Sequence, residues 1–408
     1  MSSQELGTSA TVALDTTTVD PNLTLAAPVS LGVNTSLRTT VLPRVEIVGE
    51  EQKVVADGKI RYELARRLGE GGVGEVVMAR DNDIERDVAI KRLRPELQGS
   101  HASILRFAEE VRTVGRLEHP NIVPIHDVGI HANGEYFFVM KYVEGETLEA
   151  IIDKLAAGDA EYHRRYPFER RVEIMMGILE AVAYAHSKHI IHRDIKPANV
   201  MVGPYGEVVV MDWGLAREVR GPEPLDRSAS SPDASGKRLW QTQLGALLGT
   251  PAYMSPEQAR GDELDERSDV YSLSVMFYEL LTLRHPHAEV QTLDAMLDAV
   301  KSTPAAFAVM VAHPVQGPAP IDLAWFLEKG LKKNSAERYQ NVQEMIERLQ
   351  RRAAGDIPIQ CPTTFSIRMT TLMRRALSRR PFLMPAIFLL ATLGMTGLAA
   401  VGVFAMVR

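Results

Sequence analysis

Cysteine is almost absent from this 408-residue chain, which has a single one at position 361. One cysteine excludes a disulfide framework and any zinc or iron–sulfur site built from several thiolates. The chain also lacks an excess of basic residues, since 46 Lys+Arg stand against 52 Asp+Glu and the net charge is −6. Nucleic acid is therefore not an expected partner. The start of the chain lacks the basic residues and apolar run of a secretory signal.

Acidic residues are missing from the whole C-terminal part of the chain. No Asp or Glu follows Asp356, and residues 357–408 carry six arginines, a net charge of +6. The other 40 basic residues and all 52 acidic ones lie in residues 1–356, which therefore carry −12. The overall charge is an average over two physically different regions.

Residues 1–56 have no run of apolar residues long enough to form a core. The first forty contain fourteen Ser or Thr and only four charges, with no helical or strand period. Such a composition predicts a disordered arm. The arm is either a solubilising tail or a segment that is itself phosphorylated.

Residues 57–352 have the patterns of a globular domain in two parts. Strand-like runs come first, at 75–80, 87–92 and 136–142, with one amphipathic stretch at 103–117 between them. Long helical periods follow, at 170–187, 268–283, 293–301 and 342–352. We expect an α+β fold with a small β-rich lobe (about 57–142), a larger α-rich lobe (about 143–352) and a cleft between them.

Residues 381–407 contain no charge at all. A helix of this length reaches about 40 Å, more than the roughly 30 Å of a bilayer core. A helix buried in a protein core is the alternative. The segment predicts a C-terminal transmembrane helix, preceded by a linker at 353–380. This basic juxtamembrane linker contains five arginines: Arg368, Arg374, Arg375, Arg379 and Arg380. An excess of Lys and Arg marks the cytoplasmic flank of a transmembrane segment. The arginines therefore predict a single-pass protein of the inner membrane with its globular domain in the cytoplasm.

The segment Leu68–Val76 reads L-G-E-G-G-V-G-E-V, with glycines at 69, 71 and 74. Glycines let backbone N–H groups approach phosphate oxygens, because no Cβ holds the loop away. The same spacing opens the helix of a dinucleotide-binding unit, but the residues that follow here favour a strand. The strand-like V-A-I-K at Val88–Lys91 then ends in an amine, which can neutralise phosphate oxygens. Two carboxylates of the following amphipathic stretch, Glu109 and Glu110, are available as partners for that amine, and Glu110 is the favoured one.

The segment His192–Asn199 reads H-R-D-I-K-P-A-N and places a carboxylate, a lysine and an amide in one short loop. Asp212, in M-D-W-G, follows Asn199 by thirteen residues. Carboxylate and amide oxygens are hard ligands of the kind that Mg²⁺ prefers, with substrate phosphates completing its shell. The motif G-T-P-A-Y-M-S-P-E then runs from Gly249 to Glu257.

This ordered set of motifs resembles the eukaryotic-type (Hanks-type) protein kinase domain, of the subgroup of bacterial serine/threonine kinases. The resemblance covers residues 62–352, about 290 of 408. It implies a serine/threonine protein kinase that transfers the γ-phosphate of ATP to protein hydroxyls and to itself, in membrane-anchored signalling. ATP and Mg²⁺, with Mn²⁺ as an alternative ion, are the implied cofactors. The expected partners are protein substrates, the lipid bilayer and a second kinase domain for autophosphorylation in trans.

By this resemblance, Asp194 would orient or accept the proton of the substrate hydroxyl, and Lys196 would steady the transferred phosphoryl group. Lys91, paired with Glu110, would bind the α- and β-phosphates. Asn199 and Asp212 would hold the metal ions. The nucleotide would contact the glycine-rich loop, the adenine pocket, the gatekeeper position (140) and the hinge backbone: Leu68, Gly69, Glu70, Gly71, Gly72, Val73, Gly74, Glu75, Val76, Ala89, Lys91, Met140, Lys141, Val143 and Met201.

The same resemblance assigns supporting roles outside the phosphate site. Lys196 and Thr250 favour serine/threonine over tyrosine as the acceptor. Glu257 and Arg338 match a buried ion pair of the larger lobe, and Asp269 matches an aspartate that anchors the catalytic loop. D-W-G in place of D-F-G, S-P-E in place of A-P-E, and Lys141 in place of a glutamate are departures that leave the catalytic positions intact.

Regulation is expected in the long segment 212–257, whose middle is rich in proline, serine and charge. Arg193 precedes the catalytic aspartate, an arrangement that receives an activating phosphate. Thr242 is the predicted autophosphorylation site, because a phosphate opposite Arg193 would order the loop. Three serines are weaker candidates: Ser228, Ser230 and Ser231.

Other signals are discounted or kept as alternatives. His285 and His287 in R-H-P-H are interpreted as a loop and not a metal site, and acylation of Cys361 is not favoured. A catalytically silent pseudokinase that acts as a membrane scaffold is the alternative function, and a kinase of small molecules or lipids is a third. The intact residues at 91, 194, 199 and 212 argue against the scaffold, and the segment around Thr250 argues against the third.

Overall fold

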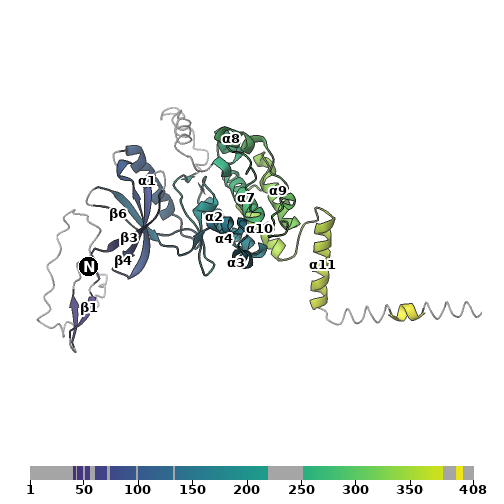
Figure 1. Ribbon diagram of the computed structural model, residues 1–408, viewed down its shortest axis with the longest axis horizontal. Helices are drawn as coiled ribbons and strands as arrows, with labels where there is room; N and C mark the ends of the chain where they lie inside the picture. Colours follow the sequence, from purple (N-terminus) through teal and green to yellow (C-terminus); the bar gives the residue numbers. More distant parts are fainter. Residues whose placement is uncertain are drawn as a thin grey trace, which may run out of the picture.

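The computed structural model describes residues 40–42, 44–48, 51–55, 60–70, 74–97, 100–131, 134–218, 251–379 and 392–397. The chain forms a β-rich N-lobe and a larger helical C-lobe, which follow one another along the long axis of the molecule (Figure 1). This is the two-part α+β arrangement that the sequence predicts.

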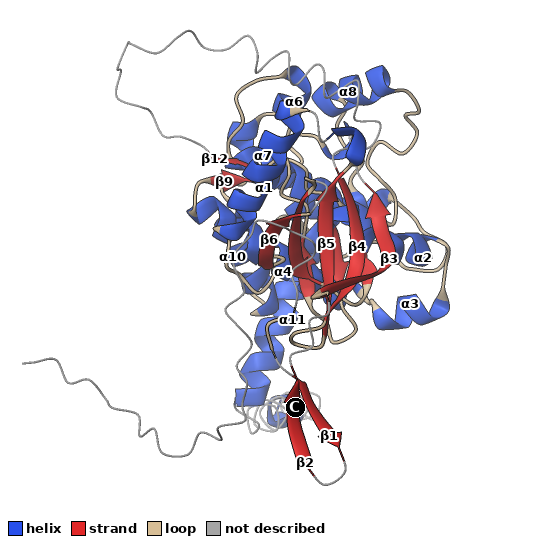
Figure 2. Cartoon of the chain, turned by 90° about the vertical axis from the view of Figure 1, so that its left-hand side faces the viewer, coloured by secondary structure: helices blue, strands red, loops and turns tan. Residues whose placement is uncertain are grey.

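The N-lobe is built on one antiparallel sheet of five strands, in the order β3-β4-β5-β7-β6 (Figure 2). Buried apolar residues form two clusters in this lobe, and in the one that includes helix α1, Phe107 of α1 packs on Phe138 of β7 with ring centroids 5.4 Å apart. Alternating burial along β4 fits a strand with one covered face. The elements of this lobe are β3 (Tyr62–Glu70), β4 (Gly74–Asp81), β5 (Arg86–Leu93), η1 (Pro95–Leu97), α1 (His101–Gly115), β6 (Ile125–Ile130) and β7 (Tyr136–Lys141).

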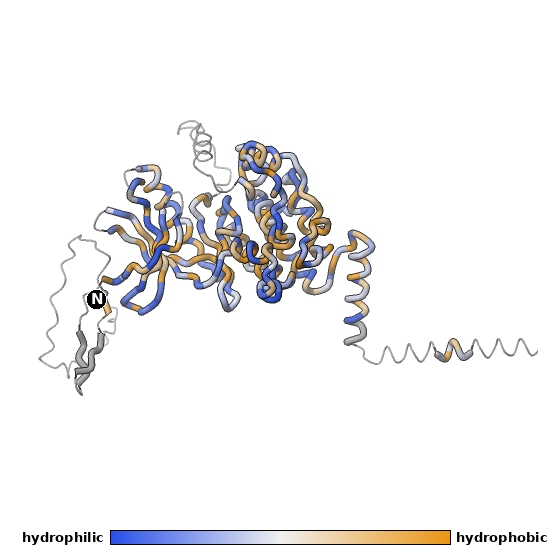
Figure 3. Tube along the Cα trace, in the orientation of Figure 1, coloured by the Kyte–Doolittle hydropathy of each residue, from blue (hydrophilic) through white to orange (hydrophobic). Residues whose placement is uncertain are grey.

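The C-lobe is organised around helix α7, which is buried on nearly all sides. Several of its buried hydroxyls bond to backbone oxygens, such as Ser274 Oγ to Val270 O at 2.7 Å. The helices of this lobe are α2 (Leu148–Ala156), α3 (Ala160–Arg165), α4 (Phe168–Ser187), α6 (Pro256–Arg260), α7 (Glu266–Thr282), α8 (Leu293–Ser302), α9 (Ile321–Gly330) and α10 (Val342–Ala353), with the turns η2 (Pro197–Asn199), η3 (Pro251–Tyr253), η4 (Ala308–Met310) and η5 (Ser335–Glu337). Figure 3 shows apolar and polar residues alternating along the elements of both lobes.

Short strands line the side of the C-lobe that faces the N-lobe. They form a three-stranded sheet, β11-β10-β8, and a β12-β9 pair. A parallel bridge between Ile122 and Val210, with Val210 N–H donating to Asn121 O at 2.8 Å, ties the N-lobe to this layer. The strands are β8 (Glu146–Thr147), β9 (Ile190–Ile191), β10 (Val200–Val202), β11 (Val208–Val210) and β12 (Arg217–Glu218).

Regular structure also occurs in two segments where none was predicted. Strands β1 (Arg44–Val48) and β2 (Glu51–Val55) pair as an antiparallel hairpin inside the arm predicted to be disordered. The alternating apolar residues of R-V-E-I-V suit such a strand, so residues 44–48 and 51–55 have regular structure within the predicted arm. Helix α11 (Pro362–Arg379) occupies most of the predicted linker 353–380. The rest of the predicted arm, residues 1–39, lies outside the described residues.

The predicted transmembrane segment 381–407 lies outside the described residues except for a short helical piece at 392–397. In the ranges that the structure describes, every helix is too short or too polar to cross a bilayer.

Candidate active site

Three charged side chains from both lobes meet at the junction of the lobes. Lys91 lies on β5, Glu110 on α1, and Asp212 directly after β11 and Met211. The Nζ of Lys91 lies 2.5 Å from Glu110 Oε1 and 3.2 Å from Asp212 Oδ1. The structure thus brings together the lysine, its predicted partner and the predicted metal ligand.

The charges in this group support one another. Lys91 lowers the pKa of the Asp212 carboxyl, because the attraction outweighs the effect of burial. Burial by itself lowers the pKa of Lys91, but Asp212 and Glu110 more than offset it and raise that pKa. Burial raises the pKa of Glu110 despite the opposing effect of Lys91. We conclude that Lys91 and Asp212 are both ionised at neutral pH.

The loop from His192 to Asn199 brings together the other predicted catalytic groups. Lys196 Nζ donates to Asp194 Oδ2 at 2.7 Å, and Asn199 Nδ2 donates to Asp194 O at 2.8 Å and Oδ2 at 3.2 Å. These bonds hold the three side chains on one short turn that ends in η2. Because the amide nitrogen of Asn199 is used in this way, its Oδ1 is the atom that remains as a ligand donor.

Two residues of this region have left-handed backbone conformations. Arg193 has φ = 69° and Asp212 has φ = 57°. Such values are uncommon for residues other than glycine and persist only where the surroundings fix them. Arg193 precedes the predicted catalytic residue Asp194, and Asp212 is itself a predicted metal ligand. The strained backbone therefore coincides with the site.

Asp269 fixes the backbone of the catalytic loop from below. The carboxylate, at the start of α7, accepts the backbone N–H of His192 at 2.8 Å and that of Arg193 at 3.0 Å. It also bonds to His186 Nε2 at 2.8 Å. Burial alone would raise the pKa of Asp269, but the hydrogen bonds and the histidines hold it below its usual value. The position of the loop therefore depends on a buried, ionised carboxylate.

The end of the segment 212–257 is attached to the same loop. Ser255 caps α6 in a capping box with Gln258, whose Nε2 donates to Arg193 O at 2.8 Å. Sequence reasoning did not identify Gln258 or His186. Both act through contacts with residues 65 and 83 positions away, which no local pattern reveals.

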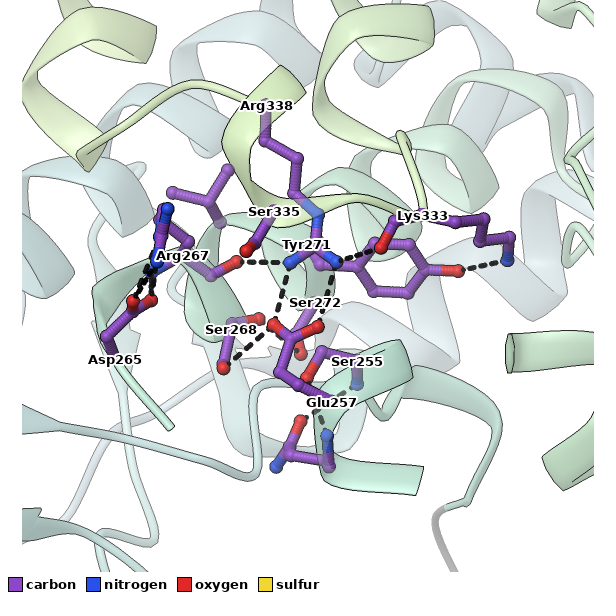
Figure 4. Close-up of polar contacts among 12 residues, drawn as sticks. Ser255, Glu257, Asp265, Arg267, Ser268, Tyr271, Ser272, Lys333, Ser335 and Arg338 are labelled. Carbon is purple, nitrogen blue, oxygen red and sulfur yellow. Dashed lines mark hydrogen bonds and ion pairs between the residues drawn. The ribbon is translucent and has the colours of Figure 1, made fainter. Parts of the chain in front are cut away.

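Glu257 and Arg338 form the predicted buried ion pair (Figure 4). The pair is bidentate, with distances of 2.7 and 2.8 Å, and Ser268 Oγ also donates to Glu257 at 2.9 Å. The guanidinium of Arg338 is fully satisfied, since it also donates to the backbone oxygens of Arg267, Lys332 and Lys333. Burial opposes ionisation of Glu257, but the bonds from Arg338 lower its pKa. The pair joins α6 to the chain before α10.

The predicted nucleotide residues lie on both sides of the junction. Ala89 of β5 is buried and pairs in the sheet with Met140 of β7. Met201 lies on β10 in the C-lobe and pairs with Thr147. Several other predicted residues are found on the strand ends and the connection that surround the junction: Leu68, Gly69, Glu70, Gly74, Glu75, Val76, Lys141 and Val143.

Some predicted residues lie outside the described part of the chain. These are Gly71, Gly72 and Val73 of the glycine-rich loop, together with Ser228, Ser230, Ser231, Thr242 and Thr250 of the segment 212–257.

His285 and His287 take part in a local hydrogen-bonded turn. The Nε2 of His285 bonds to Ala252 O at 3.1 Å, and its Nδ1 accepts the N–H of His287. Burial lowers the pKa of both rings to about 4, so they are neutral. Both ring nitrogens of His285 are thus used within the protein.

The donor set of the junction fits a divalent cation bound with phosphates. Asp212 supplies a carboxylate, Asn199 an amide oxygen, and Lys91 a cation that phosphate oxygens can approach. Both oxygen donors are hard, as Mg²⁺ requires, and too few to enclose an ion without further ligands from a bound substrate.

The sequence is similar to those of known proteins. Residues 62–349 match the family described as "Protein kinase domain". The chain is 36% identical over 298 residues to the serine/threonine-protein kinase PknD of Protochlamydia amoebophila, covering 72% of this chain and 30% of that protein. It is 37% identical over 303 residues to the serine/threonine-protein kinase PknB of Mycobacterium tuberculosis, covering 73% and 44%. The similar region thus spans less than half the length of these relatives.

Proposed function

The chain belongs to the protein kinase family, as a bacterial Hanks-type serine/threonine member, and from this premise we propose that it transfers the γ-phosphate of ATP to serine and threonine hydroxyls of proteins. The observation that carries the proposal is the position of Lys91 between Glu110 and Asp212, at 2.5 and 3.2 Å. A catalytically silent scaffold would not require a charged lysine held between two carboxylates at the junction of the lobes.

In the proposed reaction, the acceptor hydroxyl attacks the γ-phosphorus while the bond from that phosphorus to the bridging oxygen of ADP breaks. Asp194 orients the hydroxyl and receives its proton. Lys196, bonded to Asp194 at 2.7 Å, neutralises charge on the transferred group. The protein contributes mainly positioning and electrostatic stabilisation.

Lys91 binds the α- and β-phosphates in this proposal, and Glu110 keeps its side chain extended toward them. Asn199 and Asp212 would hold Mg²⁺, which supplies charge neutralisation at the β- and γ-phosphates when bound. Ala89 and Met201 would enclose the adenine ring from opposite lobes.

We also propose the topology and the regulation that the sequence predicts. The charge-free segment 381–407 would anchor the protein in the inner membrane, with the kinase domain (57–352) in the cytoplasm and residues 1–56 as an arm. Phosphorylation of Thr242, performed by a second copy, would order the segment 212–257 through Arg193. Protein substrates remain to be identified by comparing the phosphoproteomes of wild-type and Asp194→Asn cells.

The enzyme proposal is tested by transfer of ³²P from ATP with Mg²⁺ to the protein itself and to a generic basic protein substrate. We expect incorporation by the wild type and loss of it in Asp194→Asn. Asp298→Asn, which changes an exposed carboxylate on α8, is the matched control and should retain activity. No incorporation by the wild type, or equal incorporation by Asp194→Asn, would reject the enzyme and favour the scaffold.

A further inference from the structure

Helix α11 presents an apolar face to solvent. Phe365, Met369, Leu372 and Met373 expose 49%, 48%, 46% and 62% of their surface. Spacings of three and four residues place them on one side of the helix. A contiguous apolar patch of this kind marks an interaction site.

Polar contacts join the first turns of α11 to the chain that follows α10. Thr364 is fully buried and accepts the N–H groups of Gln360 and Cys361, each at 2.9 Å. Arg368 forms an ion pair with Asp356 at 3.0 Å. Arg368 also donates to Ile357 O at 3.3 Å, so turning the apolar face inward would break the contacts of Arg368 with the chain after α10.

Gly355 shows how closely α11 approaches the end of the kinase domain. It has φ = 65°, and a Cβ there would lie 2.4 Å from Cγ2 of Thr371. Only glycine suits both the conformation and the contact. The chain is therefore adapted to hold α11 in this orientation.

Positive charge lies on the polar sides of the helix. Arg374 and Arg375 are exposed, and the sequence continues with Arg379 and Arg380 into the charge-free residues 381–407. An amphipathic helix with an apolar face and arginines on its polar sides is typical of helices that lie in a membrane interface. Arginines near an anionic membrane surface each add to the attraction.

We propose that α11 is an interfacial helix that binds the surface of an anionic bilayer. Phe365, Met369, Leu372 and Met373 would enter the boundary between headgroups and acyl chains, while the arginines add electrostatic attraction to the anionic surface. This inference rests on the proposed membrane anchor, because the anchor would bring α11 to the bilayer.

The position of α11 gives the proposal a geometric consequence. The helix lies at the end of the C-lobe remote from the N-lobe and runs crosswise to the long axis of the molecule (Figure 1). A helix held flat on the bilayer therefore directs the C-lobe toward the membrane and the N-lobe away from it. The junction of the lobes lies between these two ends.

The test uses the full-length chain in liposomes of phosphatidylcholine with 30% phosphatidylglycerol. A nitroxide is attached to Met369→Cys or, as the matched control, to Thr370→Cys, which is also exposed but lies about 100° further round the helix. Both variants carry Cys361→Ser, which removes the native thiol. Collisions with oxygen report the bilayer, and collisions with a nickel chelate report water. We expect the ratio of oxygen to nickel collisions to be at least about threefold higher at 369 than at 370.

Charge is tested with Arg374→Gln in the same liposomes, against Arg351→Gln on α10 as the control. Loss of one arginine near the surface should shift the binding equilibrium of α11 roughly fivefold toward the released helix, and Arg351→Gln should not. Liposomes of pure phosphatidylcholine should also weaken the protection at 369.

Equal water exposure at 369 and 370 in anionic liposomes would overturn the proposal. So would spin–spin broadening at 369 that is independent of lipid charge, because it would place a second copy on the apolar face. Alkaline extraction reports the anchor separately, and ³²P transfer reports the enzyme. If the protein is not anchored, the same labels are measured with liposomes added from outside, and the same difference is expected.

Discussion

Lys91 Nζ lies 3.2 Å from Asp212 Oδ1, although 121 positions and the junction of the two lobes separate these residues in the chain. The contact links β5 of the N-lobe to the segment that follows β11 of the C-lobe. It also keeps the proposed phosphate-binding amine beside the proposed metal ligand. The relative position of the lobes and the electrostatics of the site are thus connected through one ion pair.

Replacement of this lysine should disable phosphoryl transfer. In Lys91→Met, Asp212 and Glu110 lose their shared cation, so the pKa of each carboxyl should rise. We expect the rate of ³²P transfer to fall at least about 100-fold, since a preorganised charge at the reacting phosphates is lost. Lys188→Met, at an exposed lysine after α4, should change the rate less than about twofold. Similar rates for the two variants would show that Lys91 has no role in transfer.

Removal of the carboxylate beneath the catalytic loop should affect both stability and activity. Asp269→Ala leaves the N–H groups of His192 and Arg193 without their buried acceptor. We expect a loss of about 2–3 kcal/mol in the free energy of unfolding and a lower kcat with little change in the KM for ATP. Urea unfolding and steady-state kinetics measure these quantities. An unchanged kcat would mean that the loop keeps its geometry without Asp269.

The same carboxylate predicts a pH dependence. The pKa of Asp269 is lower in the folded protein than its usual value of about 3.9. The ionised carboxylate of Asp269 therefore contributes its full stabilisation of the folded state above the unfolded-state pKa. That stabilisation is lost as the pH falls through the lower folded-state pKa. Wild-type stability should decrease more steeply than that of Asp269→Ala as the pH is lowered below about 5. Parallel pH profiles of the two proteins would contradict the assignment.

Removing one partner of the Glu257–Arg338 pair should lower the free energy of unfolding much more than replacing both partners with uncharged residues. Arg338→Met leaves Glu257 buried without its cation, and we expect a loss of about 3–5 kcal/mol in unfolding free energy. The double variant Glu257→Gln/Arg338→Met should recover part of that loss, because no buried charge remains unpaired. The surface pair Arg284–Glu289, with side chains 54% and 86% exposed, is the control. Its removal should cost less than about 1 kcal/mol. Additive losses in the double variant would show that the two side chains act independently.

Two glycines at the ends of β3 and β4 should respond differently to alanine. A Cβ on Gly74 would lie 2.5 Å from the backbone oxygen of Arg92, whereas one on Gly69 would meet nothing within 4 Å. Gly74→Ala should therefore lower the free energy of unfolding by more than about 1 kcal/mol and raise the KM for ATP. Gly69→Ala should keep the Tm of the wild type. Equal changes in Tm for the two variants would show that β4 moves to accept the side chain.

Much of the site could be predicted because its chemistry lies in short motifs. The loop 192–199 contains three of its groups within six residues, and the structure brings Asp194, Lys196 and Asn199 into contact. Glu110 was identified from its place in an amphipathic stretch, and it does meet Lys91. Motifs of this kind report local chemistry, which the fold then assembles.

Other features could not be predicted because their patterns are weak or non-local. Strand β3 has one buried residue, Tyr62, followed by eight exposed ones, so it lacks the alternation that identifies a strand. The contacts of His186 and Gln258 join distant segments. Helix α11 has its apolar face outside the domain, and its arginines predict the cytoplasmic flank of a membrane segment rather than a helix.

The pairing of Met201 with Thr147 has a mechanical consequence for ligand binding. Met201 moves with the C-lobe, whereas Ala89 belongs to the N-lobe sheet. Gly145 lies in the connection between the lobes, and a Cβ there would lie 2.3 Å from the backbone oxygen of Val202, the residue after Met201. The connection between the lobes therefore packs closely against β10. A planar ring bound between Ala89 and Met201 would separate the two lobes by its own thickness, and that thickness would set the angle between the N-lobe and the C-lobe. Ligands of different thickness should therefore alter the distance between Lys91 and Asp212, even when they carry no phosphate.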